Sequence, residues 1–316
     1  MIVITGGTGF IGSNVCRALA GQYGADVAVV DELTDSAKLQ NIEGVPLVDV
    51  ISCPDFDRIL RHGDRWMRRV DAVIHLGACT DTREHNRSYV FATNTHFSKL
   101  VLDACISHRV PFLYASSGAV YGLARRFAED SENEQPRGAY ACSKAAFDRH
   151  VRKIIPVTGS PVTGLRYFNV YGPGERHKGL MASLIYQLHE QVAESGRAWL
   201  FGDLGGCADG EQRRDFIAVA DVVRVTLWFL GQTGTSGIFN VGTGVATSFN
   251  DIAKLVIDHH GGGVIDYVPL PASLRRSYQI LTRADLRALR AAGYPHAMTE
   301  PAAGIRAYLR QLSDPA

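Results

Sequence analysis

Tyr140 and Lys144 lie four residues apart in a stretch whose apolar spacing predicts a helix, so their side chains share one helix face. A phenol with a pKa of about 10 is a poor base at neutral pH. A lysine ammonium one turn away, together with a positively charged oxidised nicotinamide, would favour the phenolate. Tyr140 could then take a proton from a sugar hydroxyl while hydride leaves the same carbon. Ser117, at the end of the preceding predicted strand, would hydrogen-bond that oxygen, and Lys144 would also hold the nicotinamide ribose.

This interpretation depends on a nucleotide site, because a Tyr-x-x-x-Lys pair also arises by chance. Gly6, Gly9 and Gly12 form a G-x-x-G-x-x-G turn between a short apolar strand at residues 2–4 and an amphipathic helix. The first glycine permits a sharp turn, the second lets a pyrophosphate approach the backbone, and the third lets the helix pack closely on the sheet. The helix N-terminus would face the phosphates. A glycine-rich turn without a nucleotide is the alternative, and the ordered strand, turn, helix, second strand and acid favour the nucleotide.

Two acids follow that turn at positions where an adenosine could be recognised. Asp31 ends the apolar run at residues 27–30, about where an acid accepts a hydrogen bond from the adenosine ribose. Residues 45–48 predict a short third strand ending at Asp49. Asp49 could meet the adenine amino group, and it could equally be an N-cap or a loop acid.

The next predicted strand, at residues 71–76, leads to two small residues, Gly77 and Ala78. Small side chains at the end of a parallel strand would let the cofactor lie across the sheet edge. His75 comes just before that turn. We expect His75 to be a hydrogen-bonded core residue rather than a catalyst.

The order of the predicted elements indicates an α/β protein with a Rossmann-type, doubly wound parallel sheet, because apolar strands alternate with helical patterns in the first half. A smaller mixed α/β lobe would bind the substrate. We expect residues 1–170 plus about 215–245 to form the dinucleotide-binding domain, and about 171–214 plus 246–316 the substrate-binding lobe. Later helices are predicted at 89–108, 181–192, 221–230, 249–259, 284–292 and 301–312, and later strands at 199–201, 237–242 and 265–268.

The composition of the 316-residue chain is that of a globular protein with a full core, since 46% of its residues are hydrophobic. Its 33 basic and 32 acidic residues balance, which argues against a nucleic-acid partner or an anionic membrane surface. The six cysteines are widely spaced without a Cys-x-x-Cys pair, so we expect reduced thiols and no metal site. With no long apolar run and no signal-peptide pattern, a cytoplasmic protein is expected.

Two charged stretches in the second half have both a functional and a structural interpretation. Residues 175–179 are charged or ionisable except for the last, as in a solvated loop, but their position near the expected crevice favours a role for Lys178. Arg214 could clamp a diphosphate with its planar guanidinium, or could form a surface salt bridge to Asp215.

Taken together, the glycine turn, Ser117, the Tyr140–Lys144 pair and residues 169–173 (NVYGP) resemble the extended short-chain dehydrogenase/reductase superfamily. A closer similarity, running nearly end to end, is to the ADP-L-glycero-D-manno-heptose 6-epimerase family. It is carried by residues 112–117 (FLYASS), 166–173 (RYFNVYGP), 177–179 (HKG), 181–183 (MAS), 214–216 (RDF), 237–240 (GIFN) and 289–294 (LRAAGY). The superfamily motifs do not specify a substrate, whereas residues 177–179 and 289–294 are much more specific.

The resemblance implies an NAD(P)-dependent isomerase that inverts C6 of the heptose in an ADP-heptose. C6 is oxidised to a transient ketone, and hydride returns to the other face, so two proton-handling groups are needed. Tyr140 and Lys178 match these positions, and a lysine suits the second role if burial or a neighbouring cation lowers its pKa. The catalytic residues would be Ser117, Tyr140, Lys144 and Lys178, and the substrate-binding residues Ser117, Asn169, His177, Lys178, Phe201, Arg214 and Tyr278.

A tightly bound NAD or NADP is implied as the cofactor. Glu32 replaces a family asparagine and Cys53 a family lysine, while Lys38 is retained, so a 2′-phosphate should be repelled and NAD favoured over the family's usual NADP. The expected cofactor contacts are Gly6, Gly9, Phe10, Ile11, Gly12, Asp31, Glu32, Lys38, Asp49, Val50, Leu76, Gly77, Ala78, Thr93, Tyr140, Lys144 and Val170. On the substrate side the chain departs from the family at Gln187, Leu180, residues 202–210 and Arg276–Ser277, which leaves a specialised heptose pathway open.

Other functions would need other residues. A nucleotide-sugar 4-epimerase would use Ser117, Tyr140 and Lys144 but not Lys178, and is the main alternative. A 4,6-dehydratase would need an acid pair where Gly118 and Ala119 stand. A net reductase would consume free NAD(P)H. A non-enzymatic dinucleotide-sensing protein would need no base, and the intact catalytic set argues against it. The resemblance also implies a homo-oligomer.

Overall fold

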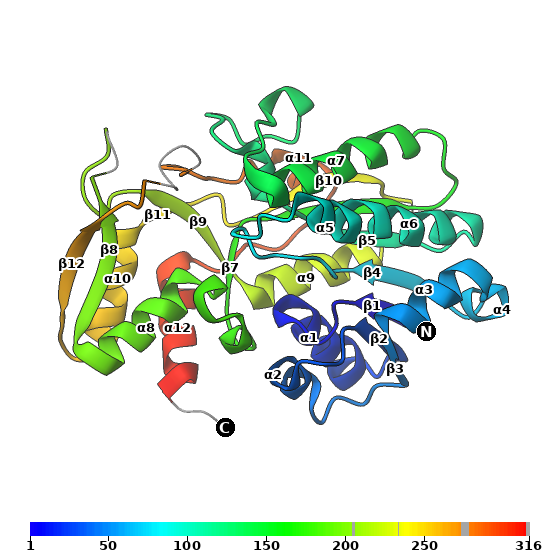
Figure 1. Cartoon of the computed structure of the whole chain (residues 1–316), viewed down its shortest axis with the longest axis horizontal. Coiled ribbons are helices and arrows are strands. Elements are labelled where there is room, and N and C mark those ends of the chain that lie inside the picture. Colours follow the sequence, from blue (N-terminus) through cyan, green and yellow to red (C-terminus); the bar gives the residue numbers. More distant parts are fainter. Residues whose placement is uncertain (204–205, 233, 273–277, 314–316) are drawn as a thin grey trace. The chain divides into compact units, whose positions relative to one another are not determined.

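The computed structural model describes residues 1–203, 206–232, 234–272 and 278–313, and its elements are labelled in Figure 1. The chain forms two compact units. The first contains Met1–Val120, Arg137–Arg166 and Val223–Phe239, and the second contains Tyr121–Pro136, Tyr167–Val222 and Asn240–Ala316. The second unit therefore also contains four segments that the sequence analysis assigned to the dinucleotide-binding domain, at residues 121–136, 167–170, 215–222 and 240–245.

A seven-stranded sheet organises the first unit, with the strand order β10-β6-β5-β4-β1-β2-β3. Its strands are β1 (Ile2–Thr5), β2 (Val27–Asp31), β3 (Asp49–Ser52), β4 (Ala72–His75), β5 (Phe112–Ser117), β6 (Val162–Tyr167) and β10 (Gly237–Val241). The chain builds outward from β1 to β3 and then returns to the other side of β1 with β4. This reversal between β1 and β4 is the doubly wound order predicted from the sequence, and ligands bind such sheets at the carboxyl ends of the strands beside it.

Helices connect these strands, and local sequence signals explain several of their ends. Ser52 caps α3, since its hydroxyl accepts from the Asp55 N–H over 3.2 Å. The helix predicted at residues 89–108 is interrupted by a π-helical segment, η3. The helices of this part are α1 (Phe10–Cys16), η1 (Arg17–Gln22), α2 (Ser36–Leu39), η2 (Gln40–Ile42), α3 (Cys53–His62), α4 (Asp64–Met67), α5 (Arg87–Phe91), η3 (Ala92–Phe97), α6 (Ser98–Ser107), η4 (Gly118–Tyr121), α7 (Gly138–Ile154) and α9 (Val219–Leu230).

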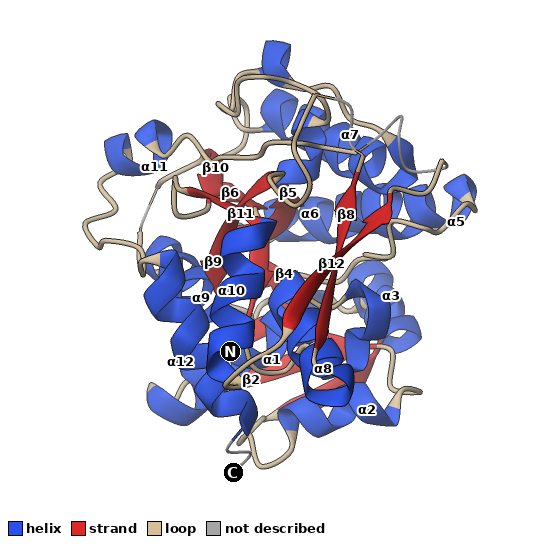
Figure 2. Cartoon of the chain, turned by 90° about the vertical axis from the view of Figure 1, so that its left-hand side faces the viewer, coloured by secondary structure: helices blue, strands red, loops and turns tan. Residues whose placement is uncertain are grey.

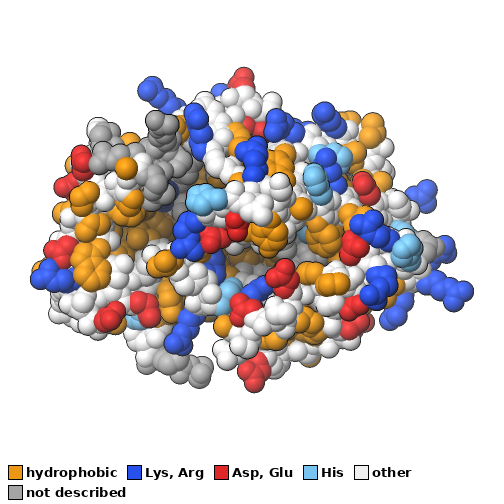
Figure 3. All heavy atoms as spheres, in the orientation of Figure 1, with side chains coloured by type: hydrophobic (Ala, Val, Ile, Leu, Met, Phe, Trp, Pro, Cys, Tyr) orange, Lys and Arg blue, Asp and Glu red, His pale blue; other side chains and the backbone are white. Residues whose placement is uncertain are grey.

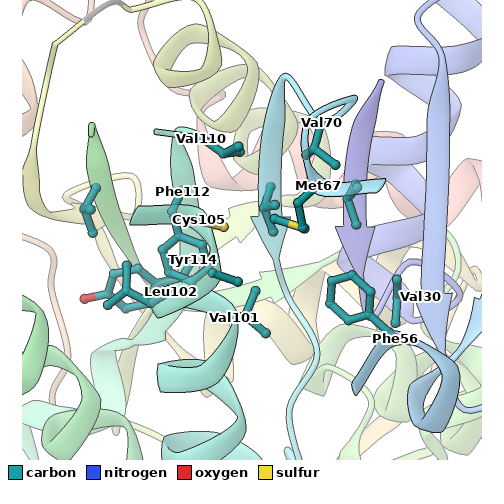
Figure 4. Close-up of a cluster of buried hydrophobic side chains, with 14 of the residues drawn as sticks. Val30, Phe56, Met67, Val70, Val101, Leu102, Cys105, Val110, Phe112 and Tyr114 are labelled. Atoms are coloured by element: carbon teal, nitrogen blue, oxygen red, sulfur yellow. The ribbon is translucent and has the colours of Figure 1, made fainter. Parts of the chain in front are cut away.

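Two hydrophobic cores form on this sheet because neighbouring residues of a strand point to opposite faces. Along β1, Val3 joins one core and Ile4 the other, and on β4 Val73 and Ile74 divide in the same way. Figure 4 shows part of the first core, in which side chains of α3 and α6 pack against β2 and β5, among them Val30, Phe56, Val101, Leu102 and Phe112. Strands buried on both faces are continuous apolar runs, which is why the sequence predicts most of them.

The third strand was wrongly predicted. It begins at Asp49, where the sequence analysis ended it, and its register pairs Asp49 with Ala28 and Ser52 with Asp31. Pro46 has no N–H to donate to a ladder. Val45 and Leu47 instead pack against the second core from a loop, which gives residues 45–48 their apolar character without a strand.

The second unit contains two small sheets. One has the order β11-β9-β7, from β7 (Asn169–Tyr171), β9 (Arg213–Ala218) and β11 (Ala246–Ser248), and the other pairs β8 (Arg197–Gly202) with β12 (Val264–Pro269), which run side by side in Figure 2. Its helices are η5 (Ser131–Asn133), η6 (Arg176–Met181), α8 (Leu184–Ser195), α10 (Phe249–His259), α11 (Arg287–Ala291) and α12 (Pro301–Ser313).

The core of the second unit packs α8, α10 and α12 around β8 and β9, with Leu188, Leu200, Phe216 and Ile252 among its buried residues. The predicted helix at 249–259 has the observed bounds, whereas α8 starts three residues later than predicted, after the N-cap Ser183. On the face shown in Figure 3, basic and acidic side chains are interspersed. None of the described helices combines the length and apolar character needed to cross a bilayer.

Candidate active site

The structure brings Ser117, Tyr140 and Lys144 together in the first unit. Tyr140 and Lys144 lie in the first two turns of α7, and Ser117 ends β5, the strand along which this helix runs. Lys144 Nζ donates to the Ala115 carbonyl oxygen over 2.8 Å, and Tyr140 hydrogen-bonds Ser117. The Ser117 hydroxyl also accepts from the Ala119 N–H over 3.1 Å, which fixes its rotamer at the strand end.

Burial dominates the ionisation of both α7 side chains. It lowers the pKa of Lys144 to about 8, and the Asp148 carboxylate opposes this by favouring the ammonium. It also raises the pKa of Tyr140, against the hydrogen bond from Ser117. The protein alone therefore does not lower the pKa of Tyr140 as expected, because the loss of hydration on burial dominates the shift.

A buried charged pair, which sequence analysis missed, stands behind these residues. Asp148 of α7 and Arg166 of β6 are both fully buried, and Arg166 donates to Asp148 Oδ2 from two nitrogens, at 2.9 and 2.8 Å. Tyr114 and Ser116 of β5 donate to the same carboxylate over 2.9 and 2.8 Å. Asp148 is one helical turn after Lys144, so the pair joins α7 to both strands beneath it.

The glycine turn fits the cradle that a dinucleotide requires. Gly6 has a φ of +69°, and a Cβ there would lie 2.6 Å from the Gly77 nitrogen. A Cβ on Gly12 would lie 2.1 Å from the Gly6 oxygen. The helix can therefore lie this close to the turn only because residue 12 is a glycine. A Cβ on Gly9 would meet only the Gly6 oxygen, at 3.2 Å. Gly9 therefore leaves room above the first turn of α1, where Phe10 and Ile11 lie.

Asp31 is more fully occupied than expected. Its Oδ2 accepts from the Thr8 N–H at 3.0 Å and the Thr8 hydroxyl at 2.6 Å, and its Oδ1 accepts from the Glu32 N–H and from Lys38 Nζ, both at 2.8 Å. Four donors use the acceptor capacity of a carboxylate. In this structure Asp31 holds the glycine turn and neutralises Lys38, and Glu32 stands exposed beside it.

Asp49 and Val50 were placed at the wrong end of their strand. The register puts Asp49 beside Ala28, three residues before the carboxyl edge, and both residues are exposed. Ser52 lies beside Asp31 at the carboxyl end of the strand, with Cys53 directly after it, whereas the predicted cofactor contacts of Asp49 and Val50 stay a prediction. Burial and the carboxylates of Asp31 and Glu32 raise the pKa of the Cys53 thiol to about 11, so it brings no charge.

The turn after β4 lies where the sequence predicts it, with Leu76, Gly77 and Ala78 half-buried, as is Thr93. His75 is a hydrogen-bonded core residue, as predicted: its ring nitrogens lie 2.7 Å from Thr5 Oγ1 and 2.8 Å from Ser98 Oγ. Asn94, another residue that sequence analysis missed, pairs its side-chain amide with the Cys79 backbone and bonds Ser143 Oγ over 3.1 Å.

In the second unit, Lys178 is half-buried in η6 rather than in a fully solvated loop. Burial lowers its pKa, and the carboxylate of Glu175 opposes this shift. Glu175 itself is buried and accepts from the Gly172 N–H at 3.1 Å, the Ser183 hydroxyl at 2.8 Å and the Ser183 N–H. Because Glu175 pins both ends of this segment, it sets the position of His177 and Lys178.

Arg214 lies in an aromatic setting. Its guanidinium carbon is 5.3 Å from the ring centre of Tyr278 and 5.6 Å from that of Phe249, and Phe201 meets Tyr278 edge-on at 6.0 Å. The predicted substrate residues Phe201, Arg214 and Tyr278 therefore cluster. Burial lowers the pKa of Arg214 to about 10.

The alternative salt bridge from Arg214 to Asp215 is wrong. Asp215 is fully buried and accepts from the backbone N–H groups of Thr243, Gly244 and Ala284, at 2.7 to 2.9 Å. It points away from Arg214 because neighbouring residues of a strand face opposite sides.

The remaining predicted positions are spread over the second unit. Asn169 is exposed and Val170 half-buried on β7. Leu180 is exposed, and the Gln187 amide donates to the Ala182 carbonyl over 2.7 Å. Arg276 and Ser277 lie outside the described residues. Over the described ranges, no group of His, Cys, Asp and Glu side chains could hold a metal ion.

Comparison with known proteins agrees with this geometry. Residues 2–242 match the family model described as the NAD dependent epimerase/dehydratase family. The chain is 45% identical over 314 residues to an ADP-L-glycero-D-manno-heptose-6-epimerase of Alkalilimnicola ehrlichii, covering 99% of this chain and 98% of that protein.

Solved structures with a similar fold include three that exceed 25% identity, two of which follow. The ADP-L-glycero-D-manno-heptose-6-epimerase of Helicobacter pylori has a TM-score of 0.87 at 28% identity, over 99% of this chain and 96% of that one. An NAD dependent NDP-hexosamine 5,6-dehydratase of tunicamycin biosynthesis has a TM-score of 0.81 at 27% identity, over 99% and 97% of the two chains.

Proposed function

The chain belongs to the NAD dependent epimerase/dehydratase family, and we propose that it converts ADP-D-glycero-D-manno-heptose to ADP-L-glycero-D-manno-heptose by inverting C6. The observation that carries the proposal is a second half-buried base, Lys178, in a chain 45% identical over nearly its whole length to an enzyme named for this reaction. Tyr140 can exchange a proton with the C6 oxygen when one face of the ketone meets the cofactor. Inversion presents the other face, and Lys178 would then exchange the proton.

Each candidate residue has a task in this reaction. Tyr140 takes the proton of the C6 hydroxyl, and Ser117 hydrogen-bonds the same oxygen. When bound, a nicotinamide would supply the hydride chemistry at C6, and in its oxidised form its positive charge would favour ionisation of Tyr140. Lys144, held by the Ala115 carbonyl, orients the ribose of that cofactor. After the 6-keto sugar turns over, Lys178 gives a proton to the new C6 alkoxide, and its burial-lowered pKa makes the ammonium a better acid.

The ADP part of the substrate is proposed to bind in the second unit. Arg214 presents a planar guanidinium, which suits two oxygens of a diphosphate. Tyr278 and Phe201 provide aromatic walls beside it. Asn169 and His177 complete the proposed sugar contacts. On this proposal the first unit binds the cofactor and the second the nucleotide sugar.

NAD rather than NADP is the proposed cofactor. Lys38 is neutralised by Asp31, Cys53 is an uncharged thiol, and Glu32 adds an exposed negative charge where a 2′-phosphate would lie. A negative side chain near the adenosine ribose would repel a 2′-phosphate and so disfavour NADP. Chromatography of the nucleotide released by denaturing the purified protein identifies the cofactor, and release of NADP would contradict the proposal. Light scattering of the purified protein tests the proposed homo-oligomer. Cell fractionation tests the proposed cytoplasmic location.

Proton NMR of the purified protein with ADP-D-glycero-D-manno-heptose, without added cofactor, tests the reaction itself. The L-glycero isomer should appear, and no free NAD(P)H should be consumed. An unchanged substrate with cofactor confirmed in the protein would refute C6 epimerisation. Other nucleotide sugars would then be tested for inversion at C4, which needs Ser117, Tyr140 and Lys144 but not Lys178.

A further inference from the structure

A chain of buried hydrogen bonds runs behind the turn at residues 76–79. Thr5 ends β1, His75 ends β4 and Ser98 begins α6, and each is only 2% exposed. Thr5 Oγ1 lies 2.7 Å from His75 Nδ1, and His75 Nε2 lies 2.8 Å from Ser98 Oγ. At the two ends, the Gly77 N–H donates to Thr5 Oγ1 over 3.2 Å, and Ser98 Oγ donates to the Asn94 carbonyl over 2.9 Å.

The hydrogen atoms of this chain have one consistent assignment. Ser98 has a single hydroxyl hydrogen, which it gives to the Asn94 carbonyl, so it accepts from His75 Nε2–H. Burial lowers the pKa of His75 to about 3, so the ring is neutral and carries only that one N–H. Its Nδ1 then accepts from the Thr5 hydroxyl, whose oxygen accepts from Gly77. The other tautomer would leave the Asn94 carbonyl without the Ser98 hydrogen.

Both ends of the chain hold residues 76–79, which follow β4 outside any helix or strand. Thr5 holds the start, because its carbonyl accepts from the Leu76 N–H over 3.0 Å and its hydroxyl accepts from Gly77. Asn94 holds the end through two bonds to the Cys79 backbone, of 2.8 and 2.9 Å. His75 and Ser98 link these two holders into one unit.

We propose that His75, as the neutral Nε2–H tautomer, is a positioning residue that fixes residues 76–79 for contact with the dinucleotide. It acts through Thr5 on one side and through Ser98 and Asn94 on the other, without touching the cofactor. The inference rests on the proposed cofactor site at residues 76–79, but not on the proposed epimerase reaction.

The test compares cofactor affinity in variants that differ by one hydroxyl. Thr5→Val keeps the side-chain shape and removes the bonds to His75 and Gly77, whereas Thr5→Ser retains them. Thr163→Val is the matched control, because Thr163 is also 2% exposed in the same sheet, and its hydroxyl donates to the Thr235 carbonyl over 3.0 Å. Calorimetric titration of each protein, after its bound nucleotide has been removed, gives dissociation constants for NAD⁺ and NADP⁺.

Thr5→Val should weaken binding of whichever cofactor binds more tightly by about tenfold, because the hydroxyl's hydrogen bonds to His75 and Gly77 are both lost. Thr5→Ser and Thr163→Val should remain within about twofold of the original protein. Unchanged affinity in Thr5→Val, or an equal loss in Thr163→Val, would overturn the proposal. If Thr5→Val does not fold, Ser98→Ala provides the same comparison, because it breaks the link between His75 and Asn94.

Nitrogen-15 NMR of the histidine side chains gives a second readout. His75 should show a protonated Nε2 and an unprotonated Nδ1 across neutral pH, and the opposite tautomer would contradict the proposal. Neither measurement uses a sugar substrate. A protein that binds the dinucleotide but converts no ADP-heptose would therefore refute the proposed function and leave this inference to be decided by the two readouts.

Discussion

Replacing Arg166 with methionine should destabilise the protein by about 3–5 kcal/mol. Arg166 gives the fully buried Asp148 carboxylate two charge-assisted hydrogen bonds, of 2.8 and 2.9 Å, and such bonds contribute about 1.5–3 kcal/mol each. The carboxylate keeps the hydroxyl hydrogens of Tyr114 and Ser116, which offset part of the loss. An uncompensated buried charge remains, and this sets the size of the effect.

The double variant Asp148→Asn with Arg166→Met separates charge from shape. Both buried charges are then absent, and the asparagine oxygen can still accept from Tyr114 and Ser116. We expect the double variant to recover more than half of the stability lost in Arg166→Met, because the removal of both ions relieves the desolvation cost.

Urea unfolding followed by circular dichroism measures these differences, with Arg197→Met as the control. Arg197 forms an exposed pair with Asp266 at 2.6 Å, and such pairs contribute about 0–1 kcal/mol. If Arg166→Met costs no more than Arg197→Met, or if the double variant is as unstable as the sum of the single variants, the buried pair does not have the role argued for it.

Three further outcomes follow from the site. Lys178→Met should lower kcat at least about 100-fold and leave ADP-sugar binding intact, since it removes one of two proton-handling groups; full activity in an NMR assay would contradict the two-base scheme. The pKa of His75 is lowered from 6.5 to about 3 on folding, so between these pH values the unfolded chain binds more protons than the folded one. The contribution of His75 to the free energy of unfolding should be fully present above pH 6.5 and should decline towards pH 3 by up to about 1.4 kcal/mol per pH unit. Urea unfolding at several pH values should show a smaller decline in His75→Asn. Glu32→Asn should narrow the preference for NAD over NADP about tenfold in calorimetry, and an unchanged ratio would place specificity elsewhere.

Residues that act through local spacing were visible in the sequence. Tyr140 and Lys144 share a helix face by their spacing alone, and the doubly wound sheet follows from alternating strands and helices. The helix at 249–259 was predicted with its observed bounds, because Ser248 caps its start and apolar residues repeat along one face.

Residues that act through tertiary contacts were not visible. Asp148 lies on a helix and Arg166 on a strand, and no local sequence pattern predicts that these two elements pack together. Glu175 looked like part of a solvated charged run, yet it is buried and ties Gly172 to Ser183. The error at Asp49 has the same origin, since hydropathy locates an apolar run but the hydrogen-bonding register defines the strand.

The ionisation of Tyr140 shows how position and charge combine in this site. Burial raises the pKa of the phenol, and the ammonium of Lys144 is directed at the Ala115 carbonyl rather than at Tyr140. In the protein's own field Tyr140 is therefore a neutral phenol that donates or shares a proton. On the proposed function, its ionisation requires an added positive charge nearby, and a nicotinamide carries that charge only in its oxidised form. Tyr140 is then the base when the sugar is oxidised in the proposed direction, and the acid only when the reverse reaction reduces the ketone on its side. Burial raises the pKa of the phenol, but it also strengthens the effect of a nearby charge because the surroundings screen that charge weakly. The pKa of Tyr140 therefore responds strongly to one added positive charge.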